Sequence, residues 1–351
     1  MRKTTLITGG AGYIGSHTVV RLVEAGHRVL VLDNLSNSCV ESIARLEQLT
    51  RSQIEFIEGD IRDPLLLDEI FSAYAIDAVV HFAGLKAVAQ SVRKPMEYYA
   101  NNVVGTLFLC QAMARAHVFN LVFSSSATVY GEPARTPIDE ALGTGKPANP
   151  YGRSKLMTEE FLTDLARSDS RWNIALLRYF NPIGAHESGL IGEAPNGVPN
   201  NLLPCLTQVA IGRAGELTVY GNDYATVDGT CVRDYIHVSD LAEGHLKALE
   251  RLHGDHGIHI WNLGTGIGYS VLQIIRGFED VTGISIPYRF AARREGDVAQ
   301  CWADASKAGR ELGWSAQRNL GQMLTDSWRW QSNNPHGYHA PIAPLLAIAG
   351  K

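Results

Sequence analysis

TTLITGGAGYIG, at residues 4–15, is the most informative stretch of the chain. A short β-branched run leads into a cluster of glycines, and apolar residues at helical spacing follow. Glycine permits a tight turn, lets phosphates approach the backbone and allows the helix to pack closely on the strand. Such a strand-turn-helix unit is typical of dinucleotide-binding α/β proteins, although the same glycines could serve a purely structural turn.

Downstream of this unit, short β-branched runs alternate with longer segments of helical period. We expect strands over 4–8, 28–32, 54–58, 78–82, 121–124 and 174–177, and helices over 13–25, 95–117, 151–167, 238–252 and 271–281. This alternation implies parallel β-α-β units with right-handed crossovers and helices on both faces of one sheet. The expected fold class is therefore α/β, with a doubly wound, Rossmann-type parallel sheet over residues 1–180.

The composition of the sequence changes after Asn181, and glycine and proline are frequent from there to Pro204. Such a stretch marks a domain change or a long functional loop. We expect a smaller mixed α/β substrate domain over 181–338, followed by a tail over 339–351 to which no role is assigned.

The composition excludes several classes of function. Of the 351 residues, 45% are apolar and 19% are charged, and the formal net charge is −5. The absence of a basic cluster argues against binding to nucleic acid or to an anionic membrane. No stretch approaches the roughly 18 apolar residues of a membrane-spanning helix.

The cysteines and histidines predict neither a disulfide framework nor a metal site. The five cysteines are scattered without a C-x-x-C pair, which fits a reducing cytoplasm. His253, His256 and His259 have ligand-like spacing, but glycines interrupt them and no thiol or carboxylate cluster joins them, so we expect a solvated loop.

Carboxylates follow two of the expected strands. Asp33 ends the second strand, where such a group accepts the hydroxyls of an adenosine ribose and repels a 2′-phosphate. NAD is therefore favoured over NADP, and Asn34 adds no positive charge to change this. Asp60 and the run Phe82-Ala83-Gly84 end the third and fourth strands, at the edge where doubly wound sheets bind ligands. Asp60 could instead cap the helix that begins near Pro64.

Tyr151 and Lys155 are four residues apart on an expected helix, so their side chains share one face. A phenol with a pKa near ~10 is a poor base, but positive charge from Lys155 and an oxidised nicotinamide favours the phenolate. Such a base can take the proton of an alcohol while a hydride leaves the same carbon. The run Ser124-Ser125-Ser126 ends a preceding strand, where a hydroxyl could bridge substrate and phenol or simply cap the strand.

Eight motifs together resemble the UDP-glucose 4-epimerase family, in the extended branch of the short-chain dehydrogenase/reductase superfamily. They are TGGAGYIG (8–15), GLKAV (84–88), SSSATVYG (124–131), Tyr151 with Lys155, LRYFNP (177–182), NNL (200–202), VRDYIH (232–237) and RREGD (293–297). The similarity extends from about residue 3 to residue 338.

This resemblance implies epimerisation at C4 of UDP-galactose and UDP-glucose through a transient 4-keto sugar, with NAD bound. Tyr151 would be the base, Lys155 would hold the nicotinamide ribose and tune Tyr151, and Ser126 would hydrogen-bond the reacting oxygen. The residues implied to line NAD are Gly9, Gly12, Tyr13, Ile14, Gly15, Asp33, Asn34, Asn37, Ser38, Asp60, Ile61, Phe82, Ala83, Gly84, Lys86, Asn101, Ser124, Tyr151, Lys155 and Phe180. Those implied to line the UDP-sugar are Ser126, Asn181, Asn201, Leu202, Thr218, Tyr220, Arg233, Arg294, Asp297 and Cys301.

Further expectations follow from the resemblance. Residues 260–263 would return to the first sheet, and the helices over 95–117 and 151–167 would form the interface of a cytoplasmic homodimer. Cys301 stands where many bacterial relatives place a tyrosine against the sugar. The missing ring leaves room for an N-acetyl group, so we expect activity on UDP-N-acetylhexosamines too, although Cys301 could simply be a small buried residue. Arg233 and Arg294 match diphosphate oxygens, with surface ion pairing as the alternative.

Two rival functions lack support in the sequence. A nucleotide-sugar dehydratase needs an added acid and base to eliminate water, but Ala127-Thr128 occupies the stretch where they would stand. A non-catalytic NAD-binding redox sensor would not need to keep Tyr151, Lys155 and Ser126 together.

Overall fold

The computed structural model describes residues 3–197, 199–252, 256–294 and 296–339. The larger part of the structure is built on a seven-stranded sheet with the order β10-β6-β5-β4-β1-β2-β3, in which every pairing is parallel. The strands are β1 (Thr4–Thr8), β2 (Arg28–Asp33), β3 (Glu55–Glu58), β4 (Ala78–His81), β5 (Asn120–Ser124), β6 (Asn173–Tyr179) and β10 (Gly257–Leu263). The expected α/β fold with a doubly wound parallel sheet is confirmed.

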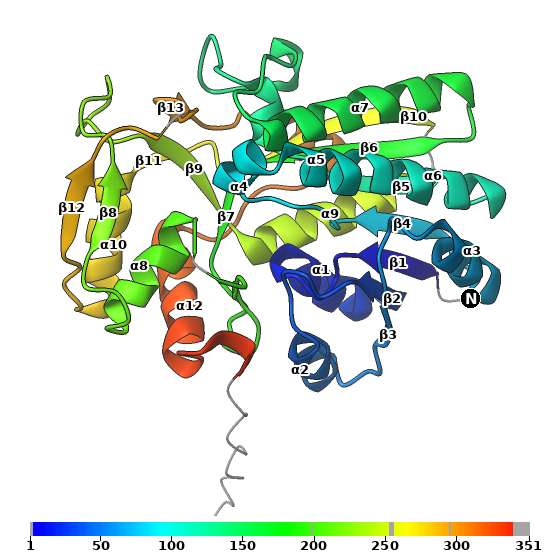
Figure 1. The fold of residues 1–351 in the computed structure, drawn as a ribbon, viewed down its shortest axis with the longest axis horizontal. Helices are drawn as coiled ribbons and strands as arrows, with labels where there is room; N and C mark the ends of the chain where they lie inside the picture. Colours follow the sequence, from blue (N-terminus) through cyan, green and yellow to red (C-terminus); the bar gives the residue numbers. More distant parts are fainter. Residues whose placement is uncertain (1–2, 198, 253–255, 295, 340–351) are drawn as a thin grey trace, which may run out of the picture.

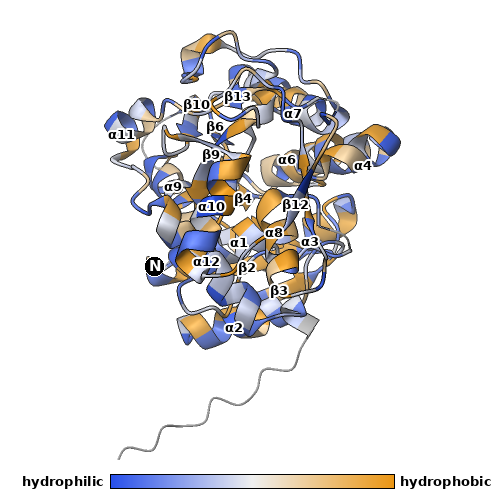
Figure 2. Ribbon diagram, turned by 90° about the vertical axis from the view of Figure 1, so that its left-hand side faces the viewer, coloured by the Kyte–Doolittle hydropathy of each residue, from blue (hydrophilic) through white to orange (hydrophobic). Residues whose placement is uncertain are grey.

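Helices cover both faces of this sheet (Figure 1). Side chains alternate between the faces along each strand, so Ile7 packs toward α1 (Tyr13–Glu24), α2 (Glu41–Thr50) and α9 (Val238–Leu252). Its neighbour Leu6 packs toward α3 (Pro64–Ala73), α6 (Gly105–Arg115) and α7 (Pro150–Ser168). Helices such as α2 carry both hydrophobic and hydrophilic residues, as the amphipathic pattern requires (Figure 2).

One expected helix and one possible helix cap differ from the sequence prediction. The helix expected over 95–117 consists of α5 (Pro95–Tyr98), the π-helical segment η1 (Tyr99–Val104) and α6, and it follows α4 (Val88–Arg93). The alternative in which Asp60 caps the helix at Pro64 is wrong, because the Asp63 carboxylate accepts the N–H groups of Leu65 and Leu66. Asp63 is closer to the first helical turn and therefore takes the capping position.

The second half of the chain forms two smaller sheets. Strand β9 (Val232–His237) pairs with β7 (Asn181–Ile183), β11 (Gly268–Ser270) and β13 (Gln300–Cys301). Strand β8 (Leu217–Tyr220) pairs with β12 (Tyr288–Ala291). Helices α8 (Leu202–Ala210), α10 (Val271–Thr282) and α12 (Leu320–Asn333) contribute to a separate hydrophobic cluster with these strands.

After residue 180, the described chain returns to the first sheet through one strand. Residues 260–263 lie in β10, which pairs with β6 as expected, and α9 packs on the same sheet. The domain boundary at residue 180 stays a prediction. The tail over 340–351 lies outside the described residues. Within the described part, no helix is long and apolar enough to cross a membrane.

Candidate active site

A cavity of about 680 Å³ opens at the carboxyl edge of the large sheet. Most residues expected to line NAD surround it, together with Asn201 of the expected substrate set. They are Gly9, Gly12, Tyr13, Ile14, Gly15, Asp33, Asn34, Asn37, Ser38, Ile61, Phe82, Ala83, Gly84, Lys86, Asn101, Tyr151 and Lys155. Asp60, Ser124 and Phe180 are not part of this wall, although Gly59 and Ile61 on either side of Asp60 are.

The glycine-rich turn leaves the backbone exposed to this cavity because side chains have no room there. A Cβ atom on Gly9 would lie 2.6 Å from the Ala83 nitrogen, and Gly9 has a φ of +72°. A Cβ atom on Gly15 would lie 2.2 Å from the Gly9 carbonyl oxygen. The turn leads into the N-terminus of α1, whose first turn carries no acidic residue. A pyrophosphate fits such a cradle of backbone N–H groups.

Asp33 is fixed at the end of β2 by three hydrogen bonds. Its carboxylate accepts the Ala11 N–H at 3.1 Å, the Leu35 N–H at 2.9 Å and the Ser38 hydroxyl at 2.8 Å. Asp60 accepts the Asn34 side-chain amide at 2.9 Å, and hydrogen bonds from Arg62 lower the pKa of Asp60 to about 2. The Asp60 carboxylate is therefore charged, and hydrogen bonds hold both carboxylates in fixed orientations.

Tyr151 and Lys155 lie in the first two turns of α7 and are buried. The helix begins where Pro150 follows Asn149, whose side chain caps the Gly152 N–H. The Lys155 ammonium donates to the Ser124 carbonyl at 2.8 Å and lies 4.7 Å from the centre of the Phe123 ring. The helix therefore fixes Lys155 against the end of strand β5.

Burial controls the protonation of this pair in the chain alone. It raises the pKa of Tyr151, against the opposing effect of a side-chain hydrogen bond with Ser126. It lowers the pKa of Lys155 to about 8, although Glu159 acts in the opposite direction. The expectation that Lys155 and an oxidised nicotinamide together favour the Tyr151 phenolate concerns the protein with NAD bound, so it stays a prediction.

A buried ionic network behind these residues was missed in the sequence. The Arg178 guanidinium pairs with the Glu159 carboxylate at 2.6 Å, and the Ser125 hydroxyl donates to the same carboxylate at 2.5 Å. The Tyr130 ring covers Arg178 and its hydroxyl donates to Asn262 at 2.6 Å. A charge inside the apolar run of β6 was the available signal, since a buried arginine requires a partner.

Asn102 is a second residue that sequence reasoning missed. It lies in η1, where its side chain accepts the Leu85 N–H at 2.8 Å and donates to the Leu85 carbonyl at 3.0 Å. It also donates to the Ser154 hydroxyl at 2.9 Å. These contacts join the Gly84–Lys86 region of the cavity wall to α7.

Apart from Ser126, the residues expected to line the UDP-sugar come from the second half of the chain. Arg233 on β9 lies 3.7 Å from the Asp297 carboxylate, and the Arg294 guanidinium lies 3.9 Å from the centre of the Tyr220 ring. Thr218 shares strand β8 with Tyr220, Asn181 begins β7, and Asn201 and Leu202 lie at the start of α8. The structure thus gathers these residues as pairs on neighbouring elements, not as one hydrogen-bonded cluster.

Cys301 connects the two halves of the expected site. It pairs with Arg233 in the sheet and packs against a cluster that contains Ala127 and Phe180. Ala127 follows Ser126, whose hydroxyl accepts the Thr128 N–H at 3.2 Å. Burial raises the pKa of Cys301 to about 11, so this residue is a neutral thiol of small volume.

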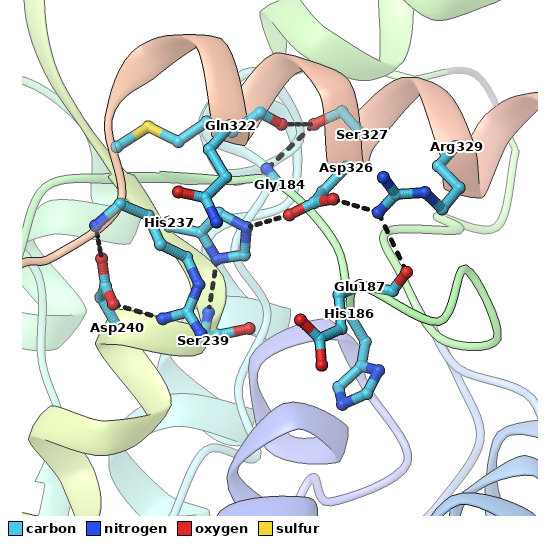
Figure 3. Close-up of polar contacts among 12 residues, drawn as sticks. Gly184, His186, Glu187, His237, Ser239, Asp240, Gln322, Asp326, Ser327 and Arg329 are labelled. Carbon is cyan, nitrogen blue, oxygen red and sulfur yellow. Dashed lines mark hydrogen bonds and ion pairs between the residues drawn. The ribbon is translucent and has the colours of Figure 1, made fainter.

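A second hollow beside α12 contains none of the expected site residues. His237 donates from Nε2 to Asp326 at 3.2 Å and accepts the Ser239 N–H on Nδ1 at 3.0 Å. Arg329 points toward Asp326 and donates to the Glu187 carbonyl at 2.9 Å (Figure 3). Asp326 thus accepts hydrogen bonds from both His237 and Arg329, which is typical of a structural cluster.

The histidines singled out in the sequence do not form a loop together. His259 lies in strand β10 and stacks on Trp261 with ring centres 5.4 Å apart, so the expected loop is wrong there. His253 is outside the described residues. Among the residues that are described, no group of three histidines, cysteines or carboxylates could hold a metal ion.

Comparison with known proteins identifies the family. The model of the NAD dependent epimerase/dehydratase family matches residues 5–264. The UDP-glucose 4-epimerase of Haemophilus influenzae is 58% identical over 333 residues, which cover 95% of this chain and 98% of that protein.

Solved structures agree with this similarity. The UDP-glucose 4-epimerase of Bifidobacterium longum, in complex with NAD+ and UDP, is 50% identical with a TM-score of 0.94, covering 95% of this chain and 100% of that one. The UDP-Glc/GlcNAc 4-epimerase of Campylobacter jejuni is 36% identical with a TM-score of 0.82, covering 94% and 99%. This chain therefore belongs to the NAD dependent epimerase/dehydratase family, within the branch of the UDP-glucose 4-epimerases.

Proposed function

We propose that this protein interconverts UDP-glucose and UDP-galactose by inverting C4 of the sugar, with NAD bound throughout. The main support for this proposal is that one cavity is lined by Tyr151, Lys155, the glycine-rich turn and Asp33. The turn suits a dinucleotide, and the tyrosine suits proton transfer at an alcohol. The relatives that this chain matches along almost its whole length are UDP-glucose 4-epimerases.

The cavity residues would hold NAD by complementary chemistry. The backbone of the glycine-rich turn would receive the pyrophosphate, and Asp33 would accept ribose hydroxyls. Lys155, with Asn101 and Lys86 on the same wall, would hold the nicotinamide half. When bound, NAD supplies an acceptor and donor of hydride.

Tyr151 would exchange the proton of the sugar 4-hydroxyl, assisted by the hydrogen bond between its side chain and Ser126. Loss of that proton together with the C4 hydride leaves a transient 4-keto sugar. Return of hydride to the opposite face requires the sugar to turn while its nucleotide stays bound. Arg233 and Arg294 would provide this grip, because guanidinium groups match diphosphate oxygens.

We further propose that UDP-N-acetylhexosamines are accepted. Cys301 packs with Ala127 and Phe180 beside Ser126, and it is far smaller than a tyrosine at the same position would be. The Campylobacter jejuni relative is a UDP-Glc/GlcNAc 4-epimerase, so this substrate range exists within the same fold.

We also propose a cytoplasmic homodimer that pairs through the helices around α6 and α7. Val92 is 57% exposed, Met96 83%, Val104 39% and Met157 46%, and all four lie on elements that pack together. Covering these apolar side chains would favour association. The free cysteines suit a reducing compartment.

The first test is to incubate the purified protein with UDP-galactose, with no cofactor added, and to follow the anomeric sugar signals by proton NMR. UDP-glucose appearing toward an equilibrium mixture supports a 4-epimerase that carries its own NAD. No UDP-glucose, even after NAD is added, contradicts the proposed reaction. A 4-keto-6-deoxy product would instead indicate a dehydratase.

A further inference from the structure

Given the proposed use of NAD, on which this inference rests, we propose that Glu193 and Asn196 slow the release of the cofactor by fastening one segment against the cavity. The contacts made by each of these two residues are called a clasp below. That segment is Gly192–Asn196, here called the strap, which lies between β7 and α8. All five of its residues line the same cavity as the glycine-rich turn and Asp33. A dinucleotide that fills the cavity therefore contacts the strap as well as the sheet edge.

The first clasp is the Glu193 side chain, which is only 10% exposed. Its carboxylate accepts the Lys86 ammonium at 3.0 Å and the Asn201 side-chain amide at 3.0 Å. The Glu193 carbonyl accepts the Trp330 indole N–H at 3.1 Å, which anchors the strap to α12. Lys86 belongs to the loop after β4, so this clasp joins the strap to the sheet that carries the turn.

The second clasp is Asn196, at the other end of the strap. Its backbone N–H donates to the Asn37 side chain at 3.1 Å. Its side-chain amide donates to the carbonyl oxygens of Ser36 and Ser38, both at 3.4 Å. These residues follow Asp33 on the loop after β2, so the strap is fastened near the expected adenosine ribose as well as near Lys86.

The charge of Glu193 makes the two possible roles distinguishable. A carboxylate beside a cavity that receives a pyrophosphate repels it unless a cation compensates, and Lys86 is that cation here. If Glu193 acts as a clasp, removing its charge opens the strap and speeds the release of NAD. If it acts only as a nearby negative charge, the same change slows the release.

The test measures cofactor release, which does not depend on turnover. Purified protein with bound NAD is mixed with excess isotope-labelled NAD, desalted at intervals and assayed for bound label by mass spectrometry. The variants are Glu193→Gln, Asn196→Ala and the double variant. The controls are Glu187→Gln, a carboxylate on the same connection but outside the cavity wall, and Asn222→Ala, on an exposed loop.

We expect release to become about three- to tenfold faster in each single variant, and faster still in the double variant. The controls should match the wild type, and circular dichroism should report folded protein throughout. Asn196→Ala changes an exposed side chain, so it keeps the test valid should Glu193→Gln fail to fold. Slower release in a folded Glu193→Gln variant, or unchanged or slower release in Asn196→Ala and the double variant, overturns the inference. A wild type that retains NAD but has no epimerase activity would contradict the proposed reaction. The NAD-release rates of the variants would still decide whether the strap retains the cofactor.

Discussion

The Lys155 ammonium donates to the Ser124 carbonyl oxygen at 2.8 Å. This bond joins α7 to the end of β5, immediately before Ser125 and Ser126. Since Ser125 also donates to Glu159 on α7, two hydrogen bonds fix the serine run relative to the helix that carries Tyr151. The positions of Tyr151, the proposed base, and of the Lys155 ammonium relative to Ser126 are therefore set by the contact between α7 and the end of β5.

Burial of Lys155 predicts a pH-dependent contribution to stability. Its pKa is lowered to about 8 in the folded protein, below the value of an exposed lysine. Between about pH 8 and the unfolded-state value near ~10.4, the unfolded chain binds more protons than the folded one, so this group makes folding more favourable as the pH rises. Relative to Lys155→Met, the wild type should gain unfolding free energy between pH 8 and pH 10. Urea titrations at both pH values measure this, and a constant difference between the two proteins would contradict it.

Tyr151→Phe removes the proposed base and changes little else in the packing. The phenol hydroxyl would move the proton of the 4-hydroxyl, so we expect turnover to fall by roughly 10²–10⁴-fold or more. NMR of UDP-galactose conversion measures this, with thermal unfolding as a check on the fold. Tyr288→Phe, on the exposed strand β12, should leave turnover unchanged. Substantial activity in Tyr151→Phe would rule out Tyr151 as the base.

Glu159→Gln should destabilise the protein strongly. The substitution leaves the buried Arg178 guanidinium without its charge partner, which costs about 3–5 kcal/mol of unfolding free energy. Denaturant titration measures the change. Asp169→Asn removes a carboxylate from an exposed pair with Arg171 and should have no measurable effect. Equal stability of the two variants would mean that the buried pair contributes little.

Motifs made of local sequence predicted most of the fold and of the cofactor site. The glycine-rich turn, Asp33 and the Tyr151–Lys155 pair depend on spacing within one strand-turn-helix unit or one helix, and these are readable from the chain. The contacts of Glu159 with Arg178 and of Asn102 with Leu85 join distant segments, so no local pattern indicates them. Glu193 lies in a loop, and its proposed role depends on contacts with Lys86 and Asn201 that the local sequence does not indicate. The burial that raises the pKa of Tyr151 in the chain alone could not be predicted either, because it depends on how distant segments pack.

Cys301→Tyr should narrow the range of substrates. A phenol ring at this position would fill space beside Arg233 and the cluster of Ala127 and Phe180. Turnover of UDP-N-acetylgalactosamine should fall by about tenfold or more relative to UDP-galactose, since overfilling a packed site is costly. Cys301→Ala keeps the space and should keep the wild-type ratio. An unchanged ratio in Cys301→Tyr would reject a role of this residue in admitting the N-acetyl group.

Met157→Asp should weaken the proposed homodimer. Met157 is 46% exposed on α7, which packs against the elements that carry Val92, Met96 and Val104. An unpaired charge buried between two subunits is unfavourable, so the dissociation constant should rise by about tenfold or more. Sedimentation velocity at micromolar concentration measures this, and Val227→Asp, at an exposed position in the second half of the chain, is the matched control. A wild type that sediments as a monomer would refute the dimer, whereas a dimer insensitive to Met157→Asp would place its interface on another face.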